Sequence, residues 1–155
     1  MKIKINNNTM RTKTKKNISK KNTKKNGLAN PTKSKIVEIF LGMLNTVKLF
    51  HWKTYSYSTH KATDELYAKL NDHIDSFIEV LLGKDESRIK VLSKSQPWLD
   101  YKHTKDFKAR VYFYREFLIN MNDVLDKNRD TDLLNIRDEI LGDINQFLYL
   151  MTFTK

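Results

Sequence analysis

Apolar residues recur every three or four positions over most of residues 30–155, which is the spacing of one face of an α-helix. The pattern predicts four helices: one beginning at Asn30-Pro31, one over residues 58–82, one beginning at residues 104–106, and one after Asp130 or Asp132. No alternation of Val, Ile or Thr with polar residues predicts a strand. The expected core consists of Ile36, Ile39, Phe40, Met43, Val47, Phe50, Leu66, Leu70, Ile74, Phe77, Leu81, Phe107, Val111, Tyr114, Leu118, Met121, Leu125, Leu133, Ile136, Ile140, Ile144, Phe147 and Met151.

The lengths of the links predict how these helices are connected. The first and third links are short, so helices one and two, and three and four, should form antiparallel hairpins. The link over residues 84–103 is long enough to run the length of the bundle, and we expect a short packed helix at Gln96-Pro97-Trp98-Leu99 within it. Two hairpins joined by one long crossover are typical of a ferritin-like four-helix bundle, so the predicted fold is all-α and ferritin-like over residues 31–155.

The positive charge is confined to the start of the chain. Residues 1–35 hold twelve of the 29 Lys and Arg residues and no acidic residue, which leaves 17 basic against 18 acidic residues in the remainder. Residues 1–30 lack the apolar surface that ordering requires, and we expect a disordered tail. The tail could bind DNA without sequence preference through its phosphates, or it could only increase solubility or reflect codon bias. The lysines expected to contact nucleic acid are Lys13, Lys15, Lys16, Lys20, Lys21, Lys24 and Lys25.

Several classes of protein are not expected from the composition. The chain has no cysteine, which excludes disulfides and thiolate metal sites. The first residues lack the apolar segment of a signal peptide, and no apolar run approaches the roughly 20 residues that span a bilayer. We therefore expect a soluble protein of the cytoplasm or nucleoid, or of a virion.

Four residues of the second predicted helix have the chemistry of metal ligands. His60 and Asp64 are four positions apart, as are Asp75 and Glu79, and all four fall on one face, away from the apolar stripe. Asp64 and Asp75 are eleven residues apart, about 16 Å along a helix, so they cannot bind one ion within one chain. A two-fold axis across this face would bring His60 and Asp64 of one chain to Asp75 and Glu79 of another.

His51, at the end of the first predicted helix, could complete each site. A set of imidazole and carboxylate ligands suits iron or zinc better than calcium or magnesium. Each residue also has a plainer interpretation: His51 as a hydrogen-bonded histidine at the edge of the core, and the others as exposed polar residues. His73 and His103 share neither the face nor the spacing and are not expected to be ligands. By default, Trp52 and Trp98 would be packing residues.

At these residues the sequence resembles the Dps family, the ferritin-like proteins that protect DNA in starved cells. The family motif has His-Trp at the end of the first helix, then His-x3-Asp and Asp-x3-Glu in the second. Here His51-Trp52, His60-x3-Asp64 and Asp75-x3-Glu79 correspond to it. The link between His51 and His60 is shorter than is usual in that family.

The resemblance implies a function. Dps proteins form hollow shells, usually of twelve subunits, and oxidise Fe(II) with hydrogen peroxide, or with oxygen, at sites between two-fold-related subunits. Many bind DNA through Lys-rich tails. The resemblance makes His51, His60, Asp64, Asp75 and Glu79 the ferroxidase residues, which bind the metal and catalyse its oxidation, and Trp52 a sink for radicals. It requires at least a two-fold dimer.

A second class of function fits the same features. The bundle could serve only for oligomerisation in an architectural protein that packages a genome or lines a capsid, with the tail binding nucleic acid. Such a protein would carry no stoichiometric iron or zinc.

Overall fold

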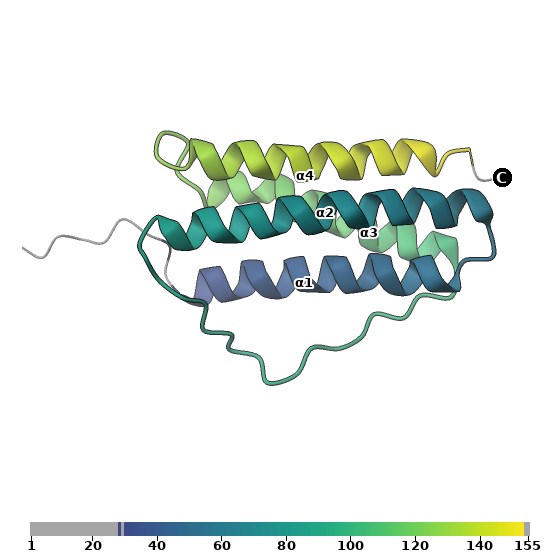
Figure 1. Cartoon of the computed structure of the whole chain (residues 1–155), viewed down its shortest axis with the longest axis horizontal. Helices are drawn as coiled ribbons and strands as arrows, with labels where there is room; N and C mark the ends of the chain where they lie inside the picture. Colours follow the sequence, from purple (N-terminus) through teal and green to yellow (C-terminus); the bar gives the residue numbers. More distant parts are fainter. Residues whose placement is uncertain (1–27, 29, 154–155) are drawn as a thin grey trace, which may run out of the picture.

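The computed structural model describes residue 28 and residues 30–153. These residues form four α-helices: α1 (Asn30–Lys53), α2 (Tyr57–Gly83), α3 (Thr104–Asn120) and α4 (Thr131–Leu150), with a short 3-10 helix, η1 (Met121–Asp123), after α3 (Figure 1). The described residues contain no strand, so the prediction of an all-α fold is confirmed. The predicted basic tail, with its seven candidate lysines from Lys13 to Lys25, lies outside the described residues and stays a prediction.

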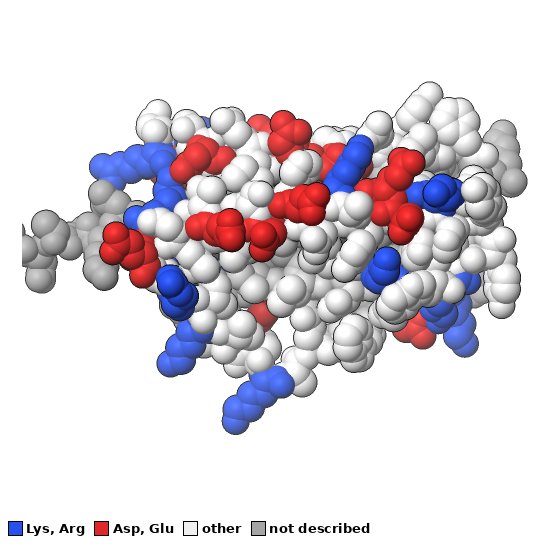
Figure 2. Space-filling view, viewed as in Figure 1, with Lys and Arg blue, Asp and Glu red and all other residues white. Residues whose placement is uncertain are grey.

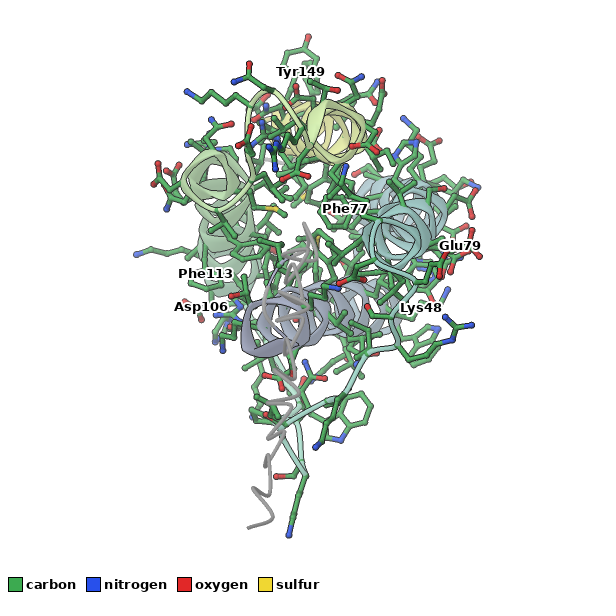
Figure 3. The ribbon with its side chains drawn as sticks, turned by 90° about the vertical axis from the view of Figure 1, so that its left-hand side faces the viewer. Lys48, Phe77, Glu79, Asp106, Phe113 and Tyr149 are labelled. Atoms are coloured by element: carbon green, nitrogen blue, oxygen red, sulfur yellow. The ribbon has the colours of Figure 1, made fainter. Side chains whose placement is uncertain are left out.

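The four helices enclose a single apolar core. The residues predicted for the core are buried, except that Ile39 and Ile136 lie at its edge and are half-buried. Aromatic rings fill its length: Phe40 meets Phe77 edge to face with ring centroids 5.2 Å apart, and Phe50 stacks on Phe107 at 3.9 Å. Figure 3 looks along the bundle and shows Phe77 pointing to its interior.

The helices run in the order predicted from the links. The chain passes along α1, returns along α2, crosses back through the long link, and then follows α3 and α4 (Figure 1). Helix α2 packs mainly on α1 and α4, and α3 packs mainly on α4. The link between α2 and α3 runs beside α1, so it is a long crossover as expected.

The helix expected at residues 96–99 is absent, and that prediction was wrong. Pro97 has no N–H to donate and disfavours a helical conformation at the residue before it. The crossover is held instead by side chains of α1: Gln96 Nε2 donates to the Glu38 carbonyl at 2.8 Å, and the Ser93 N–H donates to the Glu38 carboxylate at 3.2 Å. Trp98 is 71% exposed, so it is not the packing residue that was predicted.

Two ion pairs join helix ends that are distant in sequence. Lys33, buried in the first turns of α1, donates to Asp85 Oδ2 at 2.5 Å and to Ser87 Oγ at 2.8 Å just after α2. The hydrogen bond from Lys33 lowers the pKa of the Asp85 carboxyl below its ordinary value. Lys84 pairs in the same way with Asp132 at the start of α4, at 2.9 Å. The first pair ties together the two ends of the α1–α2 hairpin, and the second ties that hairpin to the start of α4.

None of the helices within residues 28 and 30–153 combines the length and the hydrophobicity that a bilayer-spanning helix needs.

Candidate metal centre

His51 and His60 face each other across the tight turn between α1 and α2. Three residues, Thr54 to Ser56, connect the two helices, and the Ser56 hydroxyl caps α2 by accepting from the Thr59 N–H at 3.3 Å. The imidazole rings of His51 and His60 stack with centroids 3.9 Å apart and planes 24° from parallel. The short link therefore brings the two predicted histidine ligands together.

The backbone fixes the orientation of both rings. His51 Nδ1 lies 3.0 Å from the His60 carbonyl oxygen, and His60 Nδ1 lies 3.1 Å from the His51 carbonyl oxygen. Since a carbonyl oxygen can only accept, each Nδ1 must carry the hydrogen. Nε2 is then the ring atom left to bind a metal, because the carbonyl holds the other nitrogen.

Thr63 adds a further contact to the His51 ring. Its hydroxyl lies 3.3 Å from His51 Nδ1, and it donates its own hydrogen to the Thr59 carbonyl at 2.8 Å. The hydroxyl is therefore an acceptor toward the ring, like the His60 carbonyl. Both Thr63 and His51 are buried, which limits the movement of the ring.

Asp64 brings a carboxylate to the same place. Its Oδ1 lies 3.8 Å from His51 Nε2, and its side chain is 52% exposed. Metal–ligand bonds to His nitrogen and Asp oxygen are about 2.0–2.2 Å long, so an ion fits between these two atoms without a change of backbone. His51, His60 and Asp64 thus form one half of the predicted ligand set.

A lysine lies beside this carboxylate. Lys48 Nζ is 4.0 Å from Asp64 Oδ1, 4.4 Å from the centre of the Tyr67 ring and 5.8 Å from the Trp52 ring. Its ammonium group partly neutralises Asp64 and would repel a divalent cation at the same oxygen. The sequence interpretation missed Lys48, although its position one helical turn before His51 was a signal that it lies on the same side of α1.

Asp75 and Glu79 lie further along the same helix. Both are exposed, and Figure 3 shows Glu79 projecting from α2 away from the core, on the side of the bundle where Lys48 lies. Figure 2 shows acidic side chains in a band along this face. The exposed acidic residues of α2 are Asp64, Glu65, Asp72, Asp75 and Glu79.

No group of three or more His, Asp or Glu side chains in residues 28 and 30–153 could hold a metal ion. The separation of the two half-sets along α2 agrees with this: Asp75 and Glu79 are too far from Asp64 to meet the same ion. The five predicted ligands therefore do not come together within the described part of one chain, and their role in metal binding stays a prediction.

The remaining aromatic and histidine residues take the following places. Trp52, expected by default to pack, is 67% exposed beside Lys48 because it follows the last buried turn of α1. His73 Nδ1 lies 2.9 Å from Asp143 Oδ2 and joins α2 to α4. His103 precedes α3 at its N-cap position. Neither of these two histidines approaches the His51–His60 pair.

These features define a class: a four-helix bundle with a backbone-oriented histidine pair and a carboxylate at one end of its first hairpin. Residues 51–151 match a family model described as "Family of unknown function (DUF5856)", and the chain belongs to that family. The matched region begins at His51 and includes all five predicted ligands, whereas the Lys-rich segment lies outside it. No curated protein matches the chain. No solved structure matches it.

Proposed function

We propose that the chain is a ferritin-like protein of the Dps kind, which oxidises Fe(II) at sites shared between two copies of the chain and binds DNA through its N-terminal segment. The observation that carries this proposal is the reciprocal contact of each Nδ1 atom of His51 and His60 with the backbone carbonyl of the other residue, together with the Asp64 carboxylate 3.8 Å from His51 Nε2. A purely structural histidine pair would not need an adjacent exposed carboxylate.

The arrangement of the bundle supports the ferritin-like part of the proposal. Two antiparallel hairpins are joined by one long crossover, as in ferritin-like folds. The five candidate ligands come from the end of α1 and from α2. Asp64, Asp75 and Glu79 are exposed on the outer side of the first hairpin, where a second copy can approach.

A two-fold axis across α2 would complete each ligand set. It would run two copies of α2 antiparallel and place Asp75 and Glu79 of one chain beside His51, His60 and Asp64 of the other. Each pair of chains would then carry two identical sites. His nitrogen and carboxylate oxygen together suit iron or zinc.

Iron is the substrate of the proposed reaction. Two Fe(II) ions each lose one electron, and hydrogen peroxide takes up both electrons and two protons as its O–O bond breaks, which gives two Fe(III) ions and two water molecules. Asp64 and Glu79 would anchor the ions, with His51, His60 and Asp75 completing the ligand set. Oxygen is the alternative oxidant, and zinc is the alternative metal.

Complementation between two inactive variants tests the shared site. Asp64→Ala and Glu79→Ala should each abolish ferric absorbance after Fe(II) and peroxide are mixed with the protein. In a mixed dimer of the two variants, one site regains all its ligands and the other loses both carboxylates. Random pairing should therefore restore about a quarter of wild-type activity. Activity retained by the double variant Asp64→Ala/Glu79→Ala would refute the proposed centre, and no recovery in verified mixed dimers would refute the sharing of ligands.

The basic segment supports the nucleic-acid part of the proposal. Residues 1–27 hold ten Lys and Arg residues and no acid, and neutralising phosphates with such residues releases counterions. Several tails on one oligomer would strengthen weak contacts through their effective concentration. Deleting residues 1–27 should abolish DNA retardation at low salt and leave the bundle folded, and retardation that survives the deletion would refute this part.

One observation favours the architectural alternative. The Lys48 ammonium already lies near Asp64, so the negative charge of this carboxylate is partly balanced without a metal ion. Metal analysis of the purified oligomer separates the two functions, because the ferroxidase should bind up to two iron or zinc ions at each dinuclear-type shared site, about four per pair of chains, and the architectural protein none.

A further inference from the structure

A groove lies between α1 and the crossover, away from the histidine pair. Its larger part has a volume of about 390 Å³, and Arg110 of α3 belongs to its lining. A second part of about 220 Å³ continues past Gln96 toward Thr46 and Trp98. Gly42, Gln96, Pro97 and Leu99 line both parts, so the two parts adjoin each other along α1.

Gly42 allows the crossover to approach α1 closely. A Cβ atom at this position would lie 3.0 Å from Gln96 Nε2, closer than ordinary van der Waals contact. The amide can therefore reach the Glu38 carbonyl and hold the crossover at a fixed distance from the helix. The groove is thus built by specific contacts.

The charged side chains of the groove are mostly cationic. Lys35, Lys94 and Arg110 line its larger part, and none of them forms an ion pair with another described residue. Glu38, the one acidic residue of the lining, accepts hydrogen bonds from the Ser93 N–H and the Ser34 hydroxyl. Ser93, followed by Ser34, lowers the pKa of this carboxyl, so Glu38 is engaged with the crossover.

Arg110 packs against two aromatic rings beside the groove. Its guanidinium packs against the Phe113 ring at 4.2 Å and the Tyr114 ring at 4.8 Å, and its Nε is buried without a hydrogen-bond partner among the described residues. An arginine without an ion-pair partner among the described residues, next to two lysines, is an arrangement that recognises phosphate.

The smaller part of the groove offers an aromatic surface. Trp98 lies on its wall and is 71% exposed, although the neighbouring Leu99 is half-buried. An indole that contacts solvent can stack on a nucleobase, and cations combined with such a ring are typical of sites for single-stranded nucleic acids and nucleotides. The order along α1 is cations first, near Lys35, and then the indole, near Thr46.

We propose that this groove binds a nucleoside phosphate, with the phosphate at Lys35, Lys94 and Arg110 and the base against Trp98. The ligand is a free nucleotide or the end of a single strand, since both present the same groups. This site does not depend on the iron chemistry or on the N-terminal segment.

Fluorescence of Trp98 can test the proposal in the full-length protein. The chain has two tryptophans, so in the Trp52→Phe variant the emission comes from Trp98 alone. AMP should quench it saturably, and inorganic phosphate should compete. Lys94→Gln and Arg110→Gln should each weaken AMP binding about tenfold, the effect of one lost charge-assisted contact. Lys127→Gln removes an exposed lysine outside the groove and should leave binding unchanged.

A second variant separates the two halves of the site. Trp98→Ala, followed by calorimetry, should weaken AMP binding and leave phosphate binding unchanged. Binding of a trinucleotide but not of AMP, with the same dependence on Arg110, would identify a strand end as the ligand. No saturable quenching by either probe would overturn the proposal, as would quenching that the Lys94 and Arg110 variants leave unchanged.

Discussion

Replacing Lys48 by Met should strengthen metal binding at the proposed centre. Lys48 Nζ lies 4.0 Å from Asp64 Oδ1, where a divalent ion would bind. Two unit charges at this separation interact by about 1 kcal/mol in water and about 4 kcal/mol at an effective dielectric constant of 20. Since Asp64 is 52% exposed and Lys48 29%, solvent screens the pair strongly, and the effect lies near the lower value.

The expected gain is about 1–2 kcal/mol, which corresponds to about a five- to thirtyfold lower dissociation constant. Met keeps the length and apolar character of the side chain, so the contact with Tyr67 loses only its cationic part. Removal of the same charge at Lys105, in the first turn of α3, should have no effect and provides the control.

The assay is a titration with Co²⁺ or Zn²⁺, which separates binding from oxidation. Wild-type protein that binds neither ion would refute the proposed function itself. Wild-type protein that binds, together with a Lys48→Met variant whose affinity changes less than twofold, would refute the role given to Lys48. The two failures are therefore distinguishable.

Three other predictions concern stability and the orientation of His51. Lys33→Met should lower the free energy of unfolding in urea by about 3 kcal/mol, because it leaves the Asp85 carboxylate largely buried without its cation; a loss below 1 kcal/mol would contradict this. Hydrogen bonds from Lys33 and Lys84 lower the pKa values of Asp85 and Asp132 from 3.8. The stability that these two carboxylates add is therefore fully present above pH 3.8 and is lost as the pH falls through their lower folded pKa values. The melting temperature of Asp132→Asn should accordingly change less between pH 5 and pH 2 than that of the wild type. Thr63→Val removes an acceptor from His51 Nδ1, so it should lower the free energy of unfolding by about 1 kcal/mol and weaken Zn²⁺ binding about tenfold. The control is Thr59→Val, one turn earlier, which leaves the contact with the His51 ring intact and should affect stability alone.

The helices and the core were predictable from the sequence because burial imposes a period that the residues display directly. Both hairpins and the crossover followed from link lengths, since a short link leaves only an antiparallel neighbour. The crossover itself was less predictable. Trp98 belongs to a segment that is held to α1 by hydrogen bonds from Ser93 and Gln96 to Glu38. Such contacts between distant parts of the chain cannot be predicted from a local sequence pattern.

The candidate site was predictable in part for the same reason. Spacing placed His60 and Asp64 on one face of α2, and the structure agrees. The contact of His51 with His60 depends on the turn between the two helices, whose geometry spacing does not give. Lys48 was missed because a lysine among apolar residues usually extends to solvent, whereas here Tyr67 and Asp64 hold it.

The charge of α2 links metal binding to assembly in the proposed dimer. Five exposed acidic residues follow this helix, so two copies facing each other would bring ten carboxylates together. Like charges at such a contact oppose association unless cations lie between them. In the proposed pair the metal ions occupy this position, with Lys48 at its margin. In this proposal the ions meet a complete ligand set only in the dimer, so dimerisation strengthens metal binding. By linkage, metal binding must stabilise the dimer by the same free energy.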